Sequence, residues 1–289
     1  MKHSPGIAFL IFVLFFPTLG LSANSTPLEL ESVFSAHGFD GCFVLKQGAH
    51  TLRVNPARTA TPYRPASTFK IVNALVALEN GVAPDTDFLL PWDGVTRDIP
   101  AWNADLTLEQ AFRASAVWYF VELGKRNGRD RLGAAMRALA YGNADASGSD
   151  MFWLDGGLRI SAEQQVRFLD RLARGDAPFS TRSLGLLRQM MLLDKGSGAQ
   201  GDWALYAKTG MALRPGAGDD PGDTRPVAWV VGWVERAGVP YAFALNIREA
   251  DTPGAARPAA GPSPAMNLLR LRLNLTRELL ARLGVLPAK

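Results

Sequence analysis

Patterns typical of β-strands occur at both ends of the chain, and the long stretch between them carries helical patterns instead. Near the N-terminus, residues 41–45 and 51–54 are short apolar or alternating runs, and Gln47-Gly48 between them favours a hairpin. Strand patterns return only after Gly201. The later strands that we predict are 203–208, 227–235 and 241–247. A short turn-like segment that ends in Pro240 separates the last two of these, which predicts a second hairpin.

Helical periodicity covers the middle of the chain and a short segment at each end. In these regions apolar residues recur three or four positions apart, which is the spacing of one face of an α-helix. The helices predicted on this basis are 27–37, 68–79, 108–123, 131–139, 162–172, 181–192 and 266–283. The first and last of them flank the strand patterns, and the others lie between the two groups of strands.

This order predicts a mixed α/β fold of the α+β type, in which both ends of the chain contribute strands to one antiparallel sheet. The terminal helices would flank the sheet, and an all-helical domain would be inserted into it. We assign residues 24–60 and 200–289 to the sheet-containing domain and residues 61–199 to the helical domain. A small-molecule site is expected in the cleft between the two parts.

Residues 1–23 have the layout of a secretory signal peptide. Lys2 gives a positive start, residues 7–16 form an unbroken apolar run, and Ala23 offers a small residue for cleavage. The apolar run is shorter than the roughly 20 residues that a bilayer requires. An uncleaved anchor is the alternative, because residues 17–21 could extend the run. We expect export to the periplasm and no membrane contact after cleavage.

The residue counts exclude several kinds of site. Cys42 is the only cysteine, so the chain cannot form an internal disulfide or a cysteine-based metal centre. Beyond the signal peptide only His37 and His50 remain, and they are not spaced like metal ligands on one helix face. The formal net charge of +4 is carried mostly by scattered arginines and not by a basic block, which argues against nucleic-acid binding. We therefore expect no metal site built on cysteine or histidine ligands.

Ser67 and Lys70 form the first candidate catalytic pair. Pro65 favours the start of a helix, so Ser67 is predicted in the first helical turn, with Lys70 on the same face. Apolar neighbours such as Phe69 would favour the uncharged amine of Lys70, which could then accept the proton of the Ser67 hydroxyl. Taken alone, the pair also fits an N-cap serine followed by a solvated lysine.

Three further motifs follow along the chain. Ser115-Ala116-Val117 is predicted inside the helix 108–123, Tyr141-Gly142-Asn143 in a loop, and Lys208-Thr209-Gly210 at the end of a strand. Each alone is weak, since an ordinary helix serine, a helix C-cap and an edge-strand charge would explain them. Ser-x-x-Lys, a middle serine motif and Lys-Thr-Gly, in this order, match the set found in serine enzymes that react with penicillin.

With these motifs the chain resembles the class D, or oxacillinase-type, serine β-lactamases over nearly all of its length after residue 23. The segments that carry the resemblance are Pro65-Ala66-Ser67-Thr68-Phe69-Lys70, Ser115-Ala116-Val117-Trp118, Tyr141-Gly142-Asn143, Phe152-Trp153-Leu154, Leu158-Arg159-Ile160-Ser161, Ala207-Lys208-Thr209-Gly210, Gly232-Trp233-Val234-Glu235 and Arg272-Leu273-Asn274-Leu275-Thr276. The resemblance implies a β-lactamase/transpeptidase-like fold. The chain departs from many relatives at Met211, where they carry an aromatic residue, and in the expanded acidic segment 216–224.

The resemblance also implies a chemical role for the buried lysine. Lys70 would carry a carbamate derived from CO2, an N6-carboxylysine, and this anion would be the general base. The indole N–H of Trp153 can only donate, which suits it to stabilise the carbamate; a plain core tryptophan is the alternative reading. The backbone N–H groups of Ser67 and Met211 would form the oxyanion hole.

The remaining site residues have roles in proton transfer and substrate binding. Ser115 and Lys208 would relay a proton to the leaving nitrogen of the β-lactam ring. Arg272, with Thr209, would hold the carboxylate of the substrate because a guanidinium matches two carboxylate oxygens, with Arg270 as a competing candidate. Val117 and Gly210 complete the substrate-binding set, and the apolar Val117 would help to keep Lys70 dry.

The resemblance therefore implies an enzyme that hydrolyses the β-lactam amide of penicillins and related antibiotics. Two rivals remain at this stage. One is a penicillin-binding sensor or transpeptidase with a long-lived acyl adduct, and the other is a non-catalytic periplasmic binding protein with the same fold. The preferred antibiotic, and the choice between a monomer and a homodimer, stay open.

Overall fold

The computed structural model of the chain describes residues 26–198, 201–213, 225–250 and 264–288. The predicted signal peptide, 1–23, and the expanded segment 216–224 lie outside these residues. Within the described ranges, no helix combines the length and the apolar character needed to cross a membrane.

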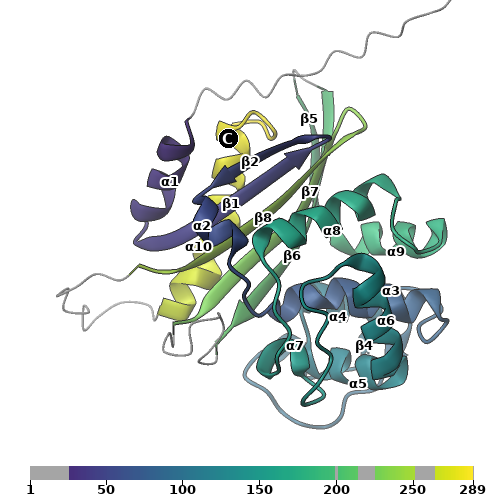
Figure 1. Cartoon of the computed structure of the whole chain (residues 1–289). Helices are drawn as coiled ribbons and strands as arrows, with labels where there is room; N and C mark the ends of the chain where they lie inside the picture. Colours follow the sequence, from purple (N-terminus) through teal and green to yellow (C-terminus); the bar gives the residue numbers. More distant parts are fainter. Residues whose placement is uncertain (1–25, 199–200, 214–224, 251–263, 289) are drawn as a thin grey trace, which may run out of the picture.

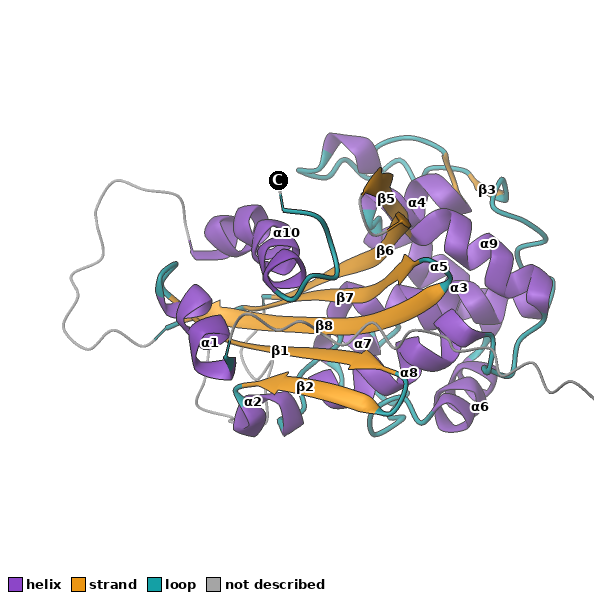
Figure 2. Ribbon diagram, turned by 90° about the horizontal axis from the view of Figure 1, so that it is seen from above, coloured by secondary structure: helices purple, strands orange, loops and turns teal. Residues whose placement is uncertain are grey.

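An antiparallel sheet built from both ends of the chain forms the centre of the molecule, as the sequence predicts, and it has six strands where the sequence predicts five (Figures 1 and 2). Its strands, in spatial order, are β2 (His50–Val54), β1 (Phe39–Gln47), β8 (Val239–Glu249), β7 (Val227–Arg236), β6 (Gly201–Ala212) and β5 (Leu192–Gly198). The predicted hairpins are β1–β2 and β7–β8. The two ends of the chain meet where β1 pairs with β8, with Phe43 opposite Leu245.

Strand β5 corrects the predicted boundary of the helical domain. Residues 192–198 fall inside the helical assignment 61–199, yet they pair with β6 and form one edge of the sheet. This segment is rich in polar residues and glycine and shows no apolar alternation, so its strand conformation depends on the neighbouring β6.

The two faces of the sheet are covered by different helices. On one face, Val230 and Val234 of β7 lie in a core shared with α1 (Pro27–Ser35) and α10 (Pro264–Arg282). On the other face, Val231 and Trp233 lie in a second core shared with the helical part. Figure 1 shows the sheet between α1 and α10 on one side and the helical part on the other.

Helix α3 (Lys70–Glu79) is the central helix of the second core, and its residues 70–78 are all buried. The other elements of this part are α2 (Pro56–Ala60), η1 (Ala66–Phe69), β3 (Leu89–Leu90), η2 (Pro100–Trp102), β4 (Leu106–Thr107), α4 (Leu108–Ala114), α5 (Val117–Asn127), α6 (Arg129–Leu139), α7 (Phe152–Asp155), α8 (Ala162–Arg174) and α9 (Thr181–Met191). Helix α8 packs directly on β1, β7 and β8. The helical part and the sheet therefore share one continuous core, and their division into two domains stays a prediction.

Candidate active site

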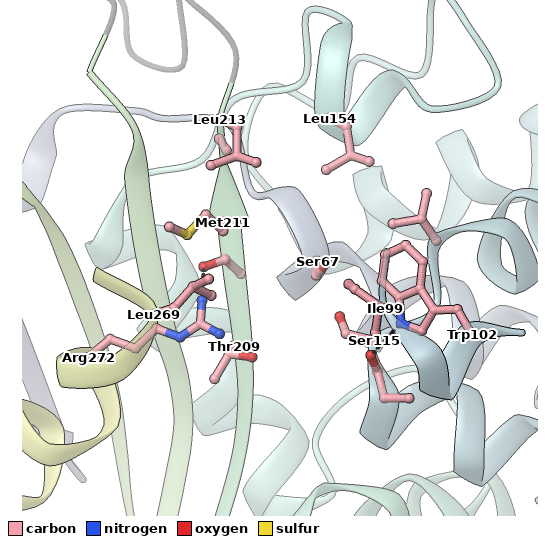
Figure 3. A pocket seen from close by; sticks show the side chains of 14 residues that line it. Ser67, Ile99, Trp102, Ser115, Leu154, Thr209, Met211, Leu213, Leu269 and Arg272 are labelled. Atoms are coloured by element: carbon pink, nitrogen blue, oxygen red, sulfur yellow. Dashed lines mark hydrogen bonds between the residues drawn. The ribbon is translucent and has the colours of Figure 1, made fainter. Parts of the chain in front are cut away.

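A pocket of about 440 Å³ opens between the helical part and the strand β6 (Figure 3). The predicted site residues that line it are Ser67, Ser115, Val117, Thr209, Gly210, Met211 and Arg272. Lys70, Lys208 and Trp153, the other predicted site residues, are buried side chains outside this lining. The pocket thus gathers side chains from η1, the α4–α5 junction, β6 and α10, which are far apart in the sequence.

Ser67 lies in the first helical turn after Pro65, as predicted, and this turn is the short 3₁₀ helix η1 that leads directly into α3. Ala66 at the start of this turn has a φ of 49°, a left-handed conformation that is unusual for alanine. This turn places the side chains of Ser67 and Lys70 on the same side of the helix. The Nζ atom of Lys70 lies 2.7 Å from Oγ of Ser67, which is hydrogen-bonding distance.

Lys70 is fully buried among aromatic side chains. Its Nζ lies 5.4 Å from the ring centroid of Phe120, and Phe69 beside it is equally buried. Burial, followed by the nearby charge of Lys208, lowers the pKa of Lys70 well below the usual value for lysine. An uncharged amine next to a hydroxyl can accept its proton, so the geometry fits an activated serine nucleophile.

Trp153 lies in α7 with its side chain fully buried. Its ring stacks on Phe69, with ring centroids 5.4 Å apart and planes 24° apart. The indole Nε1 is buried and has no hydrogen-bond partner among the described residues. A buried donor without an acceptor is costly, so this position is suited to an acceptor that the protein side chains do not supply.

Ser115 lies between two helices, so the single helix predicted over 108–123 is wrong. Helix α4 ends at Ala114, Ser115 adopts the left-handed conformation with φ 56° and ψ 35°, and α5 starts at Val117. The apolar spacing continues across this break, which is why sequence periodicity missed it. The break directs the Ser115 hydroxyl toward β6, where Nζ of Lys208 lies 3.1 Å from its Oγ.

Lys208 is the second buried lysine of the site, with 5% of its surface exposed. Its Nζ also lies 3.3 Å from the carbonyl oxygen of Thr209 and 5.4 Å from the ring centroid of Phe112. Burial, followed by the charge of Arg272, lowers the pKa of Lys208 to about 7. Both protonation states are therefore populated near neutral pH, which suits a group that passes protons on.

Gly210 lets β6 pass directly against η1. A Cβ atom at this position would lie 2.9 Å from the carbonyl oxygen of Pro65 and 3.0 Å from Cγ2 of Thr68. Only a glycine permits so close an approach without a shift of one element. The contact holds the strand segment that contains Met211 beside the turn that contains Ser67.

Arg272 projects from α10 into the pocket, whereas its competitor Arg270 is exposed and does not line it. Nη1 of Arg272 donates a hydrogen bond of 2.9 Å to the carbonyl oxygen of Gly210. Figure 3 shows the guanidinium beside Thr209. The arginine therefore provides a positive charge at the β6 side of the pocket.

Comparison with known proteins places this arrangement in a family. The family model for the penicillin binding protein transpeptidase domain matches residues 43–265. β-Lactamase OXA-48 of Klebsiella pneumoniae is 37% identical over 259 residues, which cover 88% of this chain and 87% of that protein. β-Lactamase OXA-10 of Pseudomonas aeruginosa is 37% identical over 217 residues, which cover 74% of this chain and 78% of that protein.

Solved structures that resemble this chain are also β-lactamases. OXA-85, a class D β-lactamase from Fusobacterium nucleatum subsp. polymorphum, superimposes with a TM-score of 0.76 at 29% identity and covers 91% of this chain and 100% of that one. A class D β-lactamase from Nostoc gives a TM-score of 0.75 at 34% identity and covers 89% of this chain and 99% of that one. The chain belongs to the class D β-lactamases. Its β-lactamase/transpeptidase-like fold, which the sequence resemblance implies, is thereby confirmed.

The Tyr141-Gly142-Asn143 motif of this class D β-lactamase supports the site from outside the pocket. Gly142 has a φ of 56°, and a Cβ atom there would overlap the carbonyl oxygen of Arg159. Nδ2 of Asn143 donates to the carbonyl oxygen of Gly157 at 2.9 Å. These contacts tie the loop after α6 to the segment that follows α7, and α7 carries Trp153.

Several pocket residues of this class D β-lactamase were not predicted from its sequence. They are Ile99, Trp102, Ala114, Ala212, Leu213 and Leu269. Ile99 and Trp102 come from the segment between β3 and β4, which has no strong periodicity and no motif to mark it. Leu154, expected only as an apolar neighbour of Lys70, also lines the pocket. Across the described ranges, no three His, Cys, Asp or Glu side chains are grouped as a metal site requires.

Proposed function

We propose that this chain hydrolyses the β-lactam amide of penicillins and related antibiotics through an acyl-enzyme on Ser67. In this proposal a CO2-derived carbamate on Lys70 is the general base. The observation that carries the proposal is the 2.7 Å contact between Oγ of Ser67 and Nζ of a fully buried Lys70, at the wall of a pocket of about 440 Å³. The names of the relatives, which are β-lactamases, support the choice of substrate.

Two features of the site fit a carbamate on Lys70. Carbamylation requires an uncharged amine, because the nitrogen lone pair bonds to the carbon of CO2 and one N–H proton then leaves to solvent. Burial lowers the pKa of Lys70 and so favours that form. The product is an anion, and Nε1 of Trp153 is a buried donor without a partner among the described residues. Both residues are neighbours of Phe69, since Lys70 follows it in the chain and the Trp153 ring stacks on it.

The first half of the reaction forms the acyl-enzyme. Arg272 and Thr209 hold the substrate carboxylate, and the backbone N–H groups of Ser67 and Met211 bind the oxygen of the β-lactam carbonyl. Ser67 gives its proton to the base at Lys70 and attacks the carbonyl carbon. The ring C–N bond breaks, and the proton that Ser67 gave to the base passes through Ser115 and Lys208 to the ring nitrogen, which leaves the base free again.

The second half regenerates the enzyme. A water molecule loses a proton to the base at Lys70, and its oxygen attacks the acyl carbon. The ester bond to Ser67 breaks, and the serine oxygen takes the proton that the base received from the water, which regenerates the free enzyme. The contact of 3.1 Å between Ser115 and Lys208, and a Lys208 pKa of about 7, support their assignment as the relay. In this proposal no metal ion and no organic cofactor takes part.

Turnover of a chromogenic cephalosporin by the purified mature chain tests this function. We expect many substrate molecules to be hydrolysed per enzyme and Ser67→Ala to abolish the reaction. One stoichiometric adduct, seen by intact-protein mass spectrometry without further turnover, would favour a sensor or a transpeptidase instead. Neither turnover nor adduct would favour a non-catalytic binding protein.

The proposed location follows from residues 1–23, which we propose to be removed on export to the periplasm. Periplasmic fractionation of a bacterium that expresses the full chain tests this, and N-terminal sequencing of the product gives the cleavage position. A product that retains residue 1 and stays with the membrane would instead indicate the uncleaved anchor.

A further inference from the structure

Asn73 is a fully buried polar residue one helical turn after Lys70 in α3. Its side-chain Nδ2 donates a hydrogen bond of 2.9 Å to the backbone carbonyl oxygen of Phe120 in α5. Asn73 is not part of the pocket lining, so it does not reach a bound substrate. A buried amide among apolar residues at this position needs an explanation, because such groups are costly unless they are paired.

Asn127, at the C-terminal end of α5, completes the pairing of Asn73. It is almost fully buried, and its Nδ2 lies 2.7 Å from Oδ1 and 2.9 Å from the backbone oxygen of Asn73. Two turns of α5, at Phe120 and at Asn127, are therefore tied to the same residue of α3. We call Asn73 and Asn127 the amide clamp.

Gly124 lies between these two attachment points in the middle of α5. A Cβ atom at this position would lie 3.4 Å from Nδ2 of Asn73 and 3.8 Å from Cζ3 of Trp153. The middle of α5 therefore lies in van der Waals reach of both the amide clamp and the indole that we propose to hold the carbamate.

The residue to which the clamp binds, Phe120, also contacts the proposed base. Its ring centroid lies 5.4 Å from Nζ of Lys70. A shift of α5 relative to α3 would move this ring and admit water to the amine. Hydration favours the charged ammonium, and an ammonium cannot bond to CO2.

We propose that the amide clamp positions Phe120 over Lys70 and thereby sets how completely Lys70 holds its CO2-derived carbamate. This inference rests on the proposed function. Asn73 and Asn127 are positioning residues, since they act through Phe120 and touch neither the substrate nor the reacting atoms. A clamp that only stabilised the fold would change the unfolding temperature but not the bicarbonate requirement of the folded enzyme.

The test uses the full mature chain with Asn73→Leu and Asn127→Leu, after removal of CO2 at acidic pH and return to neutral pH. Two quantities are measured as bicarbonate is added: the rate of cephalosporin hydrolysis and the intensity of the Lys70 carbamate signal in ¹³C NMR with labelled bicarbonate. We expect the half-saturating bicarbonate concentration to rise about tenfold in Asn73→Leu and less in Asn127→Leu. A tenfold change is of the size usual for the energetic coupling between residues in contact.

Leu30→Ala is the matched control, because Leu30 is buried on the opposite face of the sheet, in the core beneath α1 and α10. It should lower the unfolding temperature and leave the bicarbonate requirement as in the wild type. At saturating bicarbonate, the KM of both clamp variants for the cephalosporin should lie within about twofold of the wild-type value. If Asn73→Leu does not fold, Asn127→Leu is the milder variant that still tests the inference, because it removes one end of the clamp and keeps the bond from Asn73 to Phe120. A bicarbonate requirement above that of Leu30→Ala supports the inference, and one equal to that of Leu30→Ala overturns it.

Unchanged bicarbonate curves in the folded clamp variants would overturn the inference. The failure of the proposed function looks different, because the wild type itself would then show neither a carbamate signal nor a bicarbonate requirement. The two results can therefore be told apart in the same experiment.

Discussion

The two sides of the pocket each hold a buried lysine next to a serine, but they differ in what surrounds the amine. On the helical side, Lys70 is fully buried among aromatic rings and lies 2.7 Å from Ser67. On the β6 side, Lys208 keeps 5% of its surface exposed, contacts a backbone carbonyl and lies 3.1 Å from Ser115. The similar geometry of the two pairs shows that spacing alone does not assign their roles.

The surroundings of the amines separate those roles. Burial lowers the pKa of both lysines: that of Lys70 lies well below the usual value for lysine, and that of Lys208 is about 7. Lys70, whose amine is the more completely buried, suits reaction with CO2 and the role of general base. The amine that can exist in both forms near neutral pH suits a proton relay.

Lys70→Ala should have the largest effect of the variants that test this difference. We expect turnover of a cephalosporin to fall by about 10²–10⁴-fold, the contribution typical of a general base, with an acyl adduct accumulating on Ser67. Lys208→Ala should slow the reaction without such an adduct. Intact-protein mass spectrometry during turnover measures both, and an adduct pattern shared by the two variants would show that the lysines are equivalent.

Gly210→Ala should be the next most damaging change. Its Cβ would lie too close to the Pro65 carbonyl oxygen, so β6 must move away from η1 and take the Met211 N–H with it. We expect kcat to fall by about 10²–10³-fold, as when one oxyanion donor is lost. Gly185→Ala in α9 is the control, because open space surrounds that glycine; equal losses in the two variants would argue against this role of Gly210.

Trp153→Phe should have a smaller effect that bicarbonate reverses. The ring can still stack on Phe69, but the N–H donor is lost, so activity in air should drop about tenfold, the loss expected for one hydrogen bond to a charged group. Trp233→Phe is a close control, since its indole nitrogen is also buried without a partner among the described residues. A bicarbonate requirement that rises equally in both variants would contradict the assignment of Trp153.

The smallest expected effect concerns stability rather than activity. The pKa of Lys208 falls from 10.5 to about 7 on folding, so between these pH values the unfolded chain binds more protons than the folded one. Stability should therefore rise with pH across this window, and the cost of burying the ammonium is present in full below it. Lys208→Met should reduce that rise in the unfolding temperature, whereas Lys195→Met, at an exposed lysine, should not. An unchanged slope in Lys208→Met would mean that Lys208 stays charged in the folded state.

The sequence predicts most strands and helices of the molecule because the spacing of apolar residues that marks them is a local signal. The strands that became β1, β2, β6, β7 and β8 all carry apolar or alternating runs, and each was predicted in place. Strand β5 carries no such run, since only its pairing with β6 makes it a strand. Periodicity likewise continued through Ser115, although the backbone there leaves the helix.

The candidate site likewise combines residues that local motifs identify with residues that only the fold identifies. Ser67, Lys70, Ser115 and Lys208 could be found because each belongs to a short motif. The choice of Arg272 over Arg270 needed the direction of α10, which two positions in a sequence do not define. Ile99 and Trp102 are apolar residues of an irregular segment, and only the folded structure shows that they line the pocket.

The most direct test of the central claim is ¹³C NMR of the wild-type mature chain in labelled bicarbonate, with Lys70→Ala and Lys208→Ala measured alongside. The account predicts one carbamate resonance that disappears in Lys70→Ala, persists in Lys208→Ala, and is lost on acidification and regained on neutralisation. A wild-type enzyme that turns over β-lactams without any such resonance, or a resonance that survives Lys70→Ala, would contradict it.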